Sequence, residues 1–267
     1  MITSPANPKL RYVRHLAHRS FRAREQRLVL EGVRLLHDAL DSGVAPAFVL
    51  VDADARLDGP VAALCQRLDT LRVPLLDLAR PLFNELAETA SPQGILAVVP
   101  SAPRPWPERP NLVLVLDRVR EPGNVGTILR SALAAGADGV LLAPGTADAT
   151  QAKAVRAGMG AHFRLPYRAD GWAEIDRRTA ELPLWLADAG GDVCYDAVDW
   201  RGPAAVVIGG EASGPSPAAR VRAQGTVRIP MAGPAESLNA AMAATVLLFE
   251  AARQRRAPGA NQERSRP

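Results

Sequence analysis

The chain has 267 residues and is 48% hydrophobic, so it can bury one large core or two moderate ones. Its formal net charge of +4 is compatible with an anionic partner. No apolar run reaches membrane-spanning length, and the first residues lack the apolar stretch of a secretory signal. With two cysteines and four histidines the chain cannot build a zinc cluster. We therefore expect a cytoplasmic protein without membrane segments, metal or disulfide.

A basic stripe occupies residues 9–27. There, Glu25 is the single acidic residue among seven basic ones, which are Lys9, Arg11, Arg14, Arg19, Arg22, Arg24 and Arg27. Such a stripe suits phosphates, although a solvated helix face explains an isolated charge run equally well. The only two lysines, Lys9 and Lys153, lie outside any G-x-x-x-x-G-K-[ST] motif, which excludes a Walker-type phosphate loop.

The first hundred residues read as a small α/β sandwich. Within residues 27–43, apolar side chains at helical spacing predict a helix that ends at Gly43, where a left-handed cap fits. A strand pattern at residues 46–52, a helix pattern at 61–71 and a strand pattern at 94–99 follow. We expect this alternation to form a first domain, residues 1–100.

Five prolines then interrupt the pattern, at Pro100, Pro103, Pro105, Pro107 and Pro110. Proline continues neither a helix nor a central strand, so residues 101–110 are predicted to be an extended linker. A second domain, residues 111–256, follows it. The last stretch, residues 257–267, is short and polar, and we expect it to be disordered.

The second domain alternates apolar strands with helices. Strands that are apolar throughout indicate a mostly parallel sheet covered on both faces, and hence an α/β fold. The predicted strands are residues 111–117, 139–145, 182–188, 204–210 and 226–231, and the predicted helices are residues 125–136, 149–160 and 237–254.

Ligands of open α/β sheets collect at the carboxyl ends of the strands, where three loops stand out. The first, "REPGNVG", places Asn124 before a helix expected to begin near Val125, and the same helix carries Arg130. Asn124 fits a helix cap, and an arginine beside an apolar face either reaches water or holds an anion.

The second loop, "EASGPS", has Glu211 at a strand exit, and the glycines beside it permit close approach to a ligand or simply a tight turn. The third, "AGPAESLNAAM", opens the last helix with Ser237 or its neighbour as the expected cap and Asn239 in the first turn. Capping and function explain Ser237 equally well when it is considered alone.

Together these loops resemble the motifs of the SpoU (TrmH-like) branch of the SPOUT methyltransferases. The family pattern is met in order by "DRVREPGNVGTILR", "VIGGEASG" and "IPMAGPAESLN". The match covers residues 111–256. The first domain resembles, less specifically, the L30e-like RNA-binding extension of many members.

This resemblance implies a deep trefoil knot in the carboxyl-terminal domain and transfer of a methyl group from S-adenosylmethionine to a ribose 2′-hydroxyl of RNA. Carried over by motif, the cofactor contacts fall on Gly209, Ile229, Met231 and Leu238. The family acts as a homodimer, in which Arg130 would complete the active site of the partner subunit.

The resemblance also assigns roles at the reacting centre. A guanidinium stays protonated at neutral pH, so we expect Arg130 to bind the adjacent phosphate and stabilise the developing alkoxide rather than act as a base. Asn124 would position Arg130 or the ribose, while Glu211, Ser237 and Asn239 would line the site by hydrogen bonding.

Two residues depart from the usual family pattern, and both bear on substrate fit. Pro215 stands where many relatives carry leucine or methionine, and Glu121 replaces the usual aspartate before proline.

Ribosomal RNA is the expected substrate, with Lys9, Arg11, Arg14, Arg19 and Arg22 as its phosphate contacts. The alternatives are a tRNA ribose methyltransferase and a non-catalytic RNA-binding or ribosome-binding protein of the same fold. An α/β enzyme for another nucleotide has less support, because both the Walker lysine and a dinucleotide fingerprint are missing.

Overall fold

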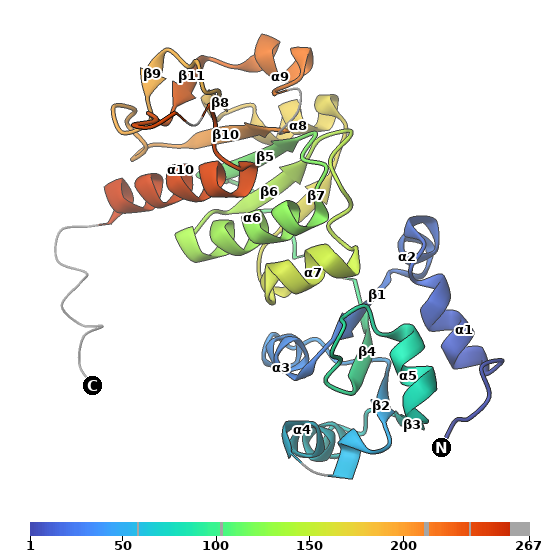
Figure 1. Cartoon of the computed structure of the whole chain (residues 1–267). Helices are drawn as coiled ribbons and strands as arrows, with labels where there is room; N and C mark the ends of the chain where they lie inside the picture. The colour runs from blue at the N-terminus through green and yellow to red at the C-terminus, as the bar shows by residue number, and fades with distance from the viewer. Residues whose placement is uncertain (58, 102–103, 211–213, 235, 257–267) are drawn as a thin grey trace, which may run out of the picture. The chain divides into compact units, whose positions relative to one another are not determined.

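A computed structural model describes residues 1–57, 59–101, 104–210, 214–234 and 236–256 (Figure 1). The chain divides into two compact units. Unit 1 consists of Met1–Pro103 and Asp148–Arg164, and unit 2 of Arg104–Ala147 and Leu165–Pro267. The predicted disordered tail, residues 257–267, lies outside the described residues. Within the described ranges, no helix is long and apolar enough to cross a membrane.

Unit 1 contains a four-stranded mixed sheet with the order β1-β4-β2-β3. Strand β4 runs antiparallel to both of its neighbours, whereas β2 and β3 are parallel. The strands are β1 (Arg27–Glu31), β2 (Phe48–Asp52), β3 (Leu75–Leu78) and β4 (Ile95–Pro100).

Helices cover both faces of this sheet. One face packs against α3 and α4, through residues such as Leu36 and Leu64, and the other packs against α1 and α5, through residues such as Leu10 and Phe83. This confirms the predicted α/β sandwich. The helices are α1 (Pro8–His15), α2 (Arg19–Glu25), α3 (Val33–Asp41), η1 (Ala55–Leu57), α4 (Gly59–Thr70) and α5 (Arg80–Leu86).

The segment Asp148–Arg164 packs into unit 1, although it follows part of unit 2 in the sequence. It contains α7 (Ala152–Gly158) and η2 (Ala161–Phe163), and the side chains of Val155 and Phe163 belong to the core cluster of β1, α3 and α4. The second domain expected from the sequence, residues 111–256, contains this segment. The chain therefore leaves unit 2 after Ala147 and re-enters it at Leu165.

Unit 2 is built on a seven-stranded sheet with the order β7-β6-β5-β10-β8-β11-β9, and all its strand pairs are parallel. This confirms the mostly parallel sheet. The strands are β5 (Leu112–Asp117), β6 (Gly139–Leu142), β7 (Tyr167–Ala169), β8 (Leu184–Ala187), β9 (Val193–Cys194), β10 (Ala204–Gly209) and β11 (Gly225–Arg228).

Helices α6 (Pro122–Ala135) and α10 (Ala240–Arg255) lie side by side, and α8 (Trp172–Thr179) and α9 (Pro217–Arg222) contribute Ile175 and Ala219 to a core cluster on the sheet (Figure 1). A hydrogen bond of 2.7 Å between the hydroxyls of Ser131 and Thr245 links α6 to α10. The predicted alternation of strands and helices is thus present, with β7, α8, β9 and α9 in addition.

Two predicted helix starts are wrong. Helix α6 begins at Pro122 and its cap is Glu121, whose carboxylate accepts a hydrogen bond from the Gly123 amide at 3.1 Å. A proline at the first helical position loses no helical hydrogen bond, so the helix starts before Asn124. Helix α10 is capped by Asn239, not by Ser237.

Candidate active site

A pocket of about 430 Å³ opens at the carboxyl ends of β8, β10 and β11 in unit 2. This is the edge at which open parallel sheets bind ligands. Its walls come from the exits of the three strands, from the segment 229–239 and from the start of α10. The lining side chains are largely apolar, with Asp188, Arg220, Ser237 and Asn239 as the polar ones. A cavity of this size fits a small organic ligand.

All four residues assigned to the cofactor by motif line this pocket. Gly209 ends β10, and Ile229, Met231 and Leu238 come from the segment that joins β11 to α10. At Gly209 a Cβ atom would stand 2.6 Å from the backbone nitrogen of Pro215. Only glycine permits that approach of the chain to itself, so the glycine shapes the pocket wall.

The segment that follows β10 is anchored to the end of β5. The buried carboxylate of Asp117 accepts a hydrogen bond from the Ser216 amide at 2.5 Å, and Ser216 in turn caps α9 through its hydroxyl. The neighbouring Arg118 donates to the Gly214 carbonyl at 3.2 Å. Gly214 and Ser216 are thus held at the end of β5.

Asn239 and Asn124 meet between α10 and α6. The Asn239 Oδ1 accepts from the Ala241 amide at 2.9 Å and from the Met242 amide at 3.4 Å, and its Nδ2 donates to the Asn124 Oδ1 at 3.2 Å. Asn239 also lines the pocket. The first and third sequence motifs therefore converge on one asparagine pair at the pocket.

The remaining predicted catalytic residues lie in different settings. Ser237 lines the pocket. Arg130 lies on the exposed side of α6, and in the part of the chain that the structure describes it neither lines the pocket nor makes a hydrogen bond or an ion pair. Glu211 lies outside the described residues.

Two charged pocket residues were not predicted. Asp188 follows β8, and its carboxylate accepts a hydrogen bond from the Arg220 guanidinium of α9 at 2.9 Å. The position of Asp188 at the carboxyl end of a predicted strand was a signal for this site, since that strand and the predicted strand 204–210 end at the same edge of a parallel sheet. Arg220 carried no such signal, because α9 was not predicted.

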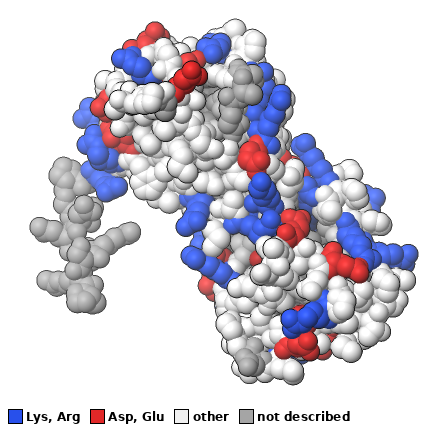
Figure 2. Space-filling model, viewed as in Figure 1, with Lys and Arg blue, Asp and Glu red and all other residues white. Residues whose placement is uncertain are grey.

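The five predicted RNA contacts of unit 1 differ in their surroundings. Figure 2 shows basic side chains on the surface of the molecule, and Lys9, Arg11 and Arg19 are exposed. Arg14 is only half-buried and pairs with Glu85 at 2.9 Å.

Arg22 departs from the predicted role of surface contact, because it is buried. Its guanidinium donates to the carbonyls of Leu16 and Ala17 at 2.8 and 2.7 Å, to Asp148 at 2.7 Å and to Thr150 at 3.1 Å. Burial by itself would raise the pKa of the Asp148 carboxyl, but the hydrogen bonds from Thr150 and Arg22 lower it overall. Arg22 thus holds the segment Asp148–Arg164 in unit 1 rather than facing a ligand.

The described side chains offer no set of ligands for a metal ion. Among the described residues, no group of three or more His, Cys, Asp and Glu side chains is placed to hold a metal ion. The chemistry that these residues can perform is hydrogen bonding, charge stabilisation and orientation.

The parallel sheet, with motif residues around a pocket at its carboxyl edge, defines an α/β protein with a cavity in unit 2 that is large enough for a small ligand. Comparison with known families identifies the family within this class. Residues 111–249 match the model described as the SpoU rRNA Methylase family, and residues 7–97 match an MRM3-like substrate binding domain. The chain therefore belongs to the SpoU rRNA methylase family, as its motifs predicted.

Curated relatives extend over most of the chain. This chain is 37% identical to the 23S rRNA (uridine(2479)-2'-O)-methyltransferase of Streptomyces viridochromogenes, over 90% of its own length and 87% of that protein. It is 35% identical to the mitochondrial rRNA methyltransferase 3 of Mus musculus, over 89% of this chain and 70% of that protein.

Solved structures show the same architecture. The SpoU methyltransferase AviRb from Streptomyces viridochromogenes, in complex with the cofactor AdoMet, superimposes with a TM-score of 0.84 and 35% identity, over 93% of this chain and 98% of that one. An AdoMet-bound rRNA methyltransferase from Sinorhizobium meliloti gives a TM-score of 0.82 at 29% identity, over 94% and 97% of the two chains. The two-domain α/β architecture is confirmed.

Proposed function

We propose that this protein transfers the methyl group of S-adenosylmethionine to a ribose 2′-hydroxyl of ribosomal RNA. The observation that carries the proposal is the pocket at the carboxyl edge of the sheet, which is lined by Gly209, Ile229, Met231 and Leu238. These are the residues that the family motifs assign to the cofactor. Relatives of the chain are rRNA methyltransferases, and solved relatives bind AdoMet.

The chemistry requires orientation and charge stabilisation rather than a metal. When bound, S-adenosylmethionine would supply an activated methyl group: the ribose oxygen bonds the methyl carbon as the carbon–sulfur bond breaks, S-adenosylhomocysteine leaves, and the hydroxyl proton passes to water. Arg130 binds the phosphate next to that ribose and stabilises the negative charge that develops on the oxygen. The Asn124–Asn239 pair sets the position of the site between α6 and α10, and Ser237 and Glu211 supply further hydrogen bonds to substrate. Correct orientation alone lowers the barrier by several kcal/mol.

A homodimer is part of this proposal, with Arg130 of one subunit completing the site of the other. Two observations support it. Arg130 is exposed on α6 and is not among the described residues that line the pocket of its own chain. Helix α10, which packs against α6, also exposes the apolar side chains Met242 and Phe249. The carboxyl-terminal trefoil knot and the cytoplasmic location likewise remain predictions.

Ribosomal RNA is preferred over tRNA because the substrate-binding domain at residues 7–97 is of the type found in MRM3-like proteins. A non-catalytic RNA-binding protein of this fold would not need an open cofactor pocket. Calorimetric titration of the purified protein with S-adenosylmethionine tests cofactor binding. Tritiated methyl transfer to total ribosomal RNA and to total tRNA tests catalysis and the choice of substrate. Binding without transfer would support the non-catalytic alternative, and label in tRNA alone would support the tRNA enzyme.

A further inference from the structure

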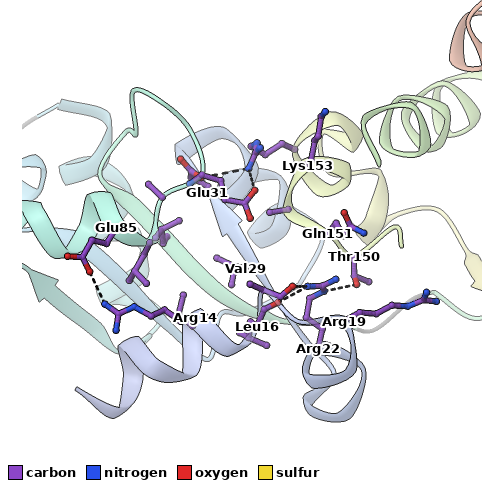
Figure 3. A pocket seen from close by; sticks show the side chains of 18 residues that line it. Arg14, Leu16, Arg19, Arg22, Val29, Glu31, Glu85, Thr150, Gln151 and Lys153 are labelled. Atoms are coloured by element: carbon purple, nitrogen blue, oxygen red, sulfur yellow. Dashed lines mark hydrogen bonds and ion pairs between the residues drawn. The ribbon is translucent and has the colours of Figure 1, made fainter. Parts of the chain in front are cut away.

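Unit 1 contains a second pocket, of about 570 Å³, that the methyl-transfer site does not use. Its walls come from α1 and α2, from β1 and β4, from the end of α5 with the two residues after it, and from residues 150–156 (Figure 3). Both family domains contribute to it, because residues 150–156 fall within the matched methyltransferase region and the other walls within the matched substrate-binding region. All of these residues belong to unit 1.

The floor of the pocket is apolar. Leu16 and Leu96 are 2% exposed and Val13 is 6% exposed, and Val29 is partly buried beside them. Apolar side chains of this kind give the flat face of a nucleobase a surface to lie on. The volume falls within the range of pockets that hold small organic groups, so one nucleotide can enter.

The rim of the pocket is charged, and the Arg14–Glu85 and Arg156–Glu88 pairs on it are partly exposed to solvent, whereas the Arg22–Asp148 pair is buried. Figure 3 shows Arg14 and Glu85 at one end of the pocket and Arg19, Arg22 and Thr150 at the other. Glu85, which pairs with Arg14, has a side chain that is 56% exposed. Arg156 makes a similar pair with Glu88 at 3.0 Å. Exposed pairs of this kind contribute little stability, so an arriving phosphate can recruit their arginines.

Arg19 is the cation best placed for a phosphate. Its side chain is 68% exposed and its guanidinium reaches Asp148 only at 3.9 Å, while Asp148 is held at 2.7 Å by the buried Arg22. The carboxylate near Arg19 is therefore already occupied. Because Arg19 is exposed and only weakly paired, it can form a bidentate contact with a phosphate without breaking a strong ion pair.

We infer, on the basis of the function proposed above, that this pocket binds one unpaired nucleotide of the substrate RNA. The phosphate contacts Arg19, the base lies over Leu16 and Val29, and the rim carboxylates accept hydrogen bonds from the edge of the base. Because single-stranded nucleotides can turn their bases outward, RNA recognition commonly takes this form. Residues 150–156, which come from the matched methyltransferase region of the sequence, form one wall of this site.

Arg19 and Arg24 provide a matched pair for the test. Both lie on α2, both are paired with one carboxylate, and their side chains are 68% and 69% exposed, but only Arg19 lines the pocket. A second variant, Ala17→Trp, fills the pocket from an exposed position and so leaves the core intact. The probe is a fluorescein-labelled random-sequence RNA of about 12 nucleotides, bound to the full-length protein and followed by anisotropy over a range of KCl concentrations.

We expect Arg19→Ala and Ala17→Trp each to weaken RNA binding about tenfold, and Arg19→Ala to reduce the salt slope by about one, while Arg24→Ala changes affinity less than about twofold. Cross-linking with 4-thiouridine in the probe should label peptides that line the pocket. Equal effects of Arg19→Ala and Arg24→Ala, or normal binding by Ala17→Trp, would overturn the assignment and leave the pocket to another partner, such as a peptide. Calorimetry with S-adenosylmethionine separates the two proposals, because failure of the wild-type protein to bind this cofactor would contradict the enzyme function itself.

Discussion

The side-chain amide of Asn239 donates to the side-chain oxygen of Asn124 at 3.2 Å while its own oxygen caps α10. One residue thus performs two separable tasks. The cap stabilises the helix, and the Nδ2 group fixes the amide of Asn124 on α6. The two tasks can be separated by substitution, because aspartate keeps the capping oxygen and lacks the amide donor.

We predict that Asn239→Asp leaves the stability of the protein unchanged but lowers methyl transfer about tenfold or more, since Asn124 must rotate its amide. Asn239→Ala should lose the cap as well, at a cost of about 1 kcal/mol in the free energy of unfolding. Urea denaturation and the rate of tritium transfer measure the two effects. Full activity of the aspartate variant would show that the asparagine pair has no role in positioning.

Arg130 tests the chemical step. Arg130→Ala should abolish methyl transfer and leave the affinity for S-adenosylmethionine nearly unchanged, because Arg130 is not among the described residues that line the cofactor pocket. Arg130→Lys should recover only part of the rate, since lysine cannot bind a phosphate in a bidentate manner. Calorimetry and single-turnover transfer measure the two quantities. A large loss of cofactor affinity in the alanine variant would assign Arg130 to cofactor binding instead.

Subunit mixing tests whether Arg130 acts across a dimer. The second parent is Leu238→Trp, which fills the cofactor pocket from an exposed position. Neither parent should transfer methyl groups, but a refolded equal mixture should recover about a quarter of wild-type activity, because half of the dimers are mixed and each has one complete site. Continued inactivity of the mixture, with mixed dimers present by native mass spectrometry, would place Arg130 in its own subunit's site.

Arg22 is predicted to be a structural residue and not a surface phosphate ligand. Arg22→Ala removes the cation paired with Asp148, which keeps only its hydrogen bonds from Thr150, and the donor to two carbonyls, so the free energy of unfolding should fall by about 3–5 kcal/mol. The matched control Arg24→Ala removes an exposed pair and should cost less than about 1 kcal/mol. Urea titration of both variants measures the two losses in the free energy of unfolding. Equal losses would contradict the structural role of Arg22 and favour its original assignment as an RNA contact.

We predict that His162 makes the free energy of unfolding depend on pH. Burial lowers its pKa from 6.5 to about 4, and its Nε2 lies 2.7 Å from the Ala149 carbonyl oxygen. The folded protein therefore keeps His162 neutral, whereas the unfolded chain takes up a proton below about pH 6.5, so acid favours unfolding.

Between pH 7 and pH 5 this linkage should remove about 2 kcal/mol from the free energy of unfolding. His162→Gln cannot titrate and should lose less stability over the same interval. Urea titrations of both proteins at the two pH values give the difference. An identical pH dependence in the variant would mean that other groups govern the acid response.

Much of unit 2 was predictable because its strands are apolar throughout and its loops carry motif residues at strand exits. Gly209, Ile229, Met231 and Leu238 could be named from the motifs, and the structure places them around one pocket. Whether they bind the cofactor remains a prediction for experiment.

The wrong predictions concern features that depend on single contacts or on long-range packing. The start of α6 depends on the Glu121 side chain and on Pro122, and not on Asn124. The burial of Arg22 depends on Asp148, which is 126 residues away in the sequence. Local periodicity carries no information about such a partner. The same holds for the packing of residues 148–164 into unit 1.

The most direct test of the central claim is to locate the transferred methyl group. Ribosomal RNA is incubated with the protein and tritiated S-adenosylmethionine and then digested with alkali, which cleaves next to free 2′-hydroxyls only. We predict label in an alkali-resistant dinucleotide from ribosomal RNA, and no label with Arg130→Ala. Label in mononucleotides, which would indicate a methylated base, or no label with protein that binds the cofactor would contradict the account.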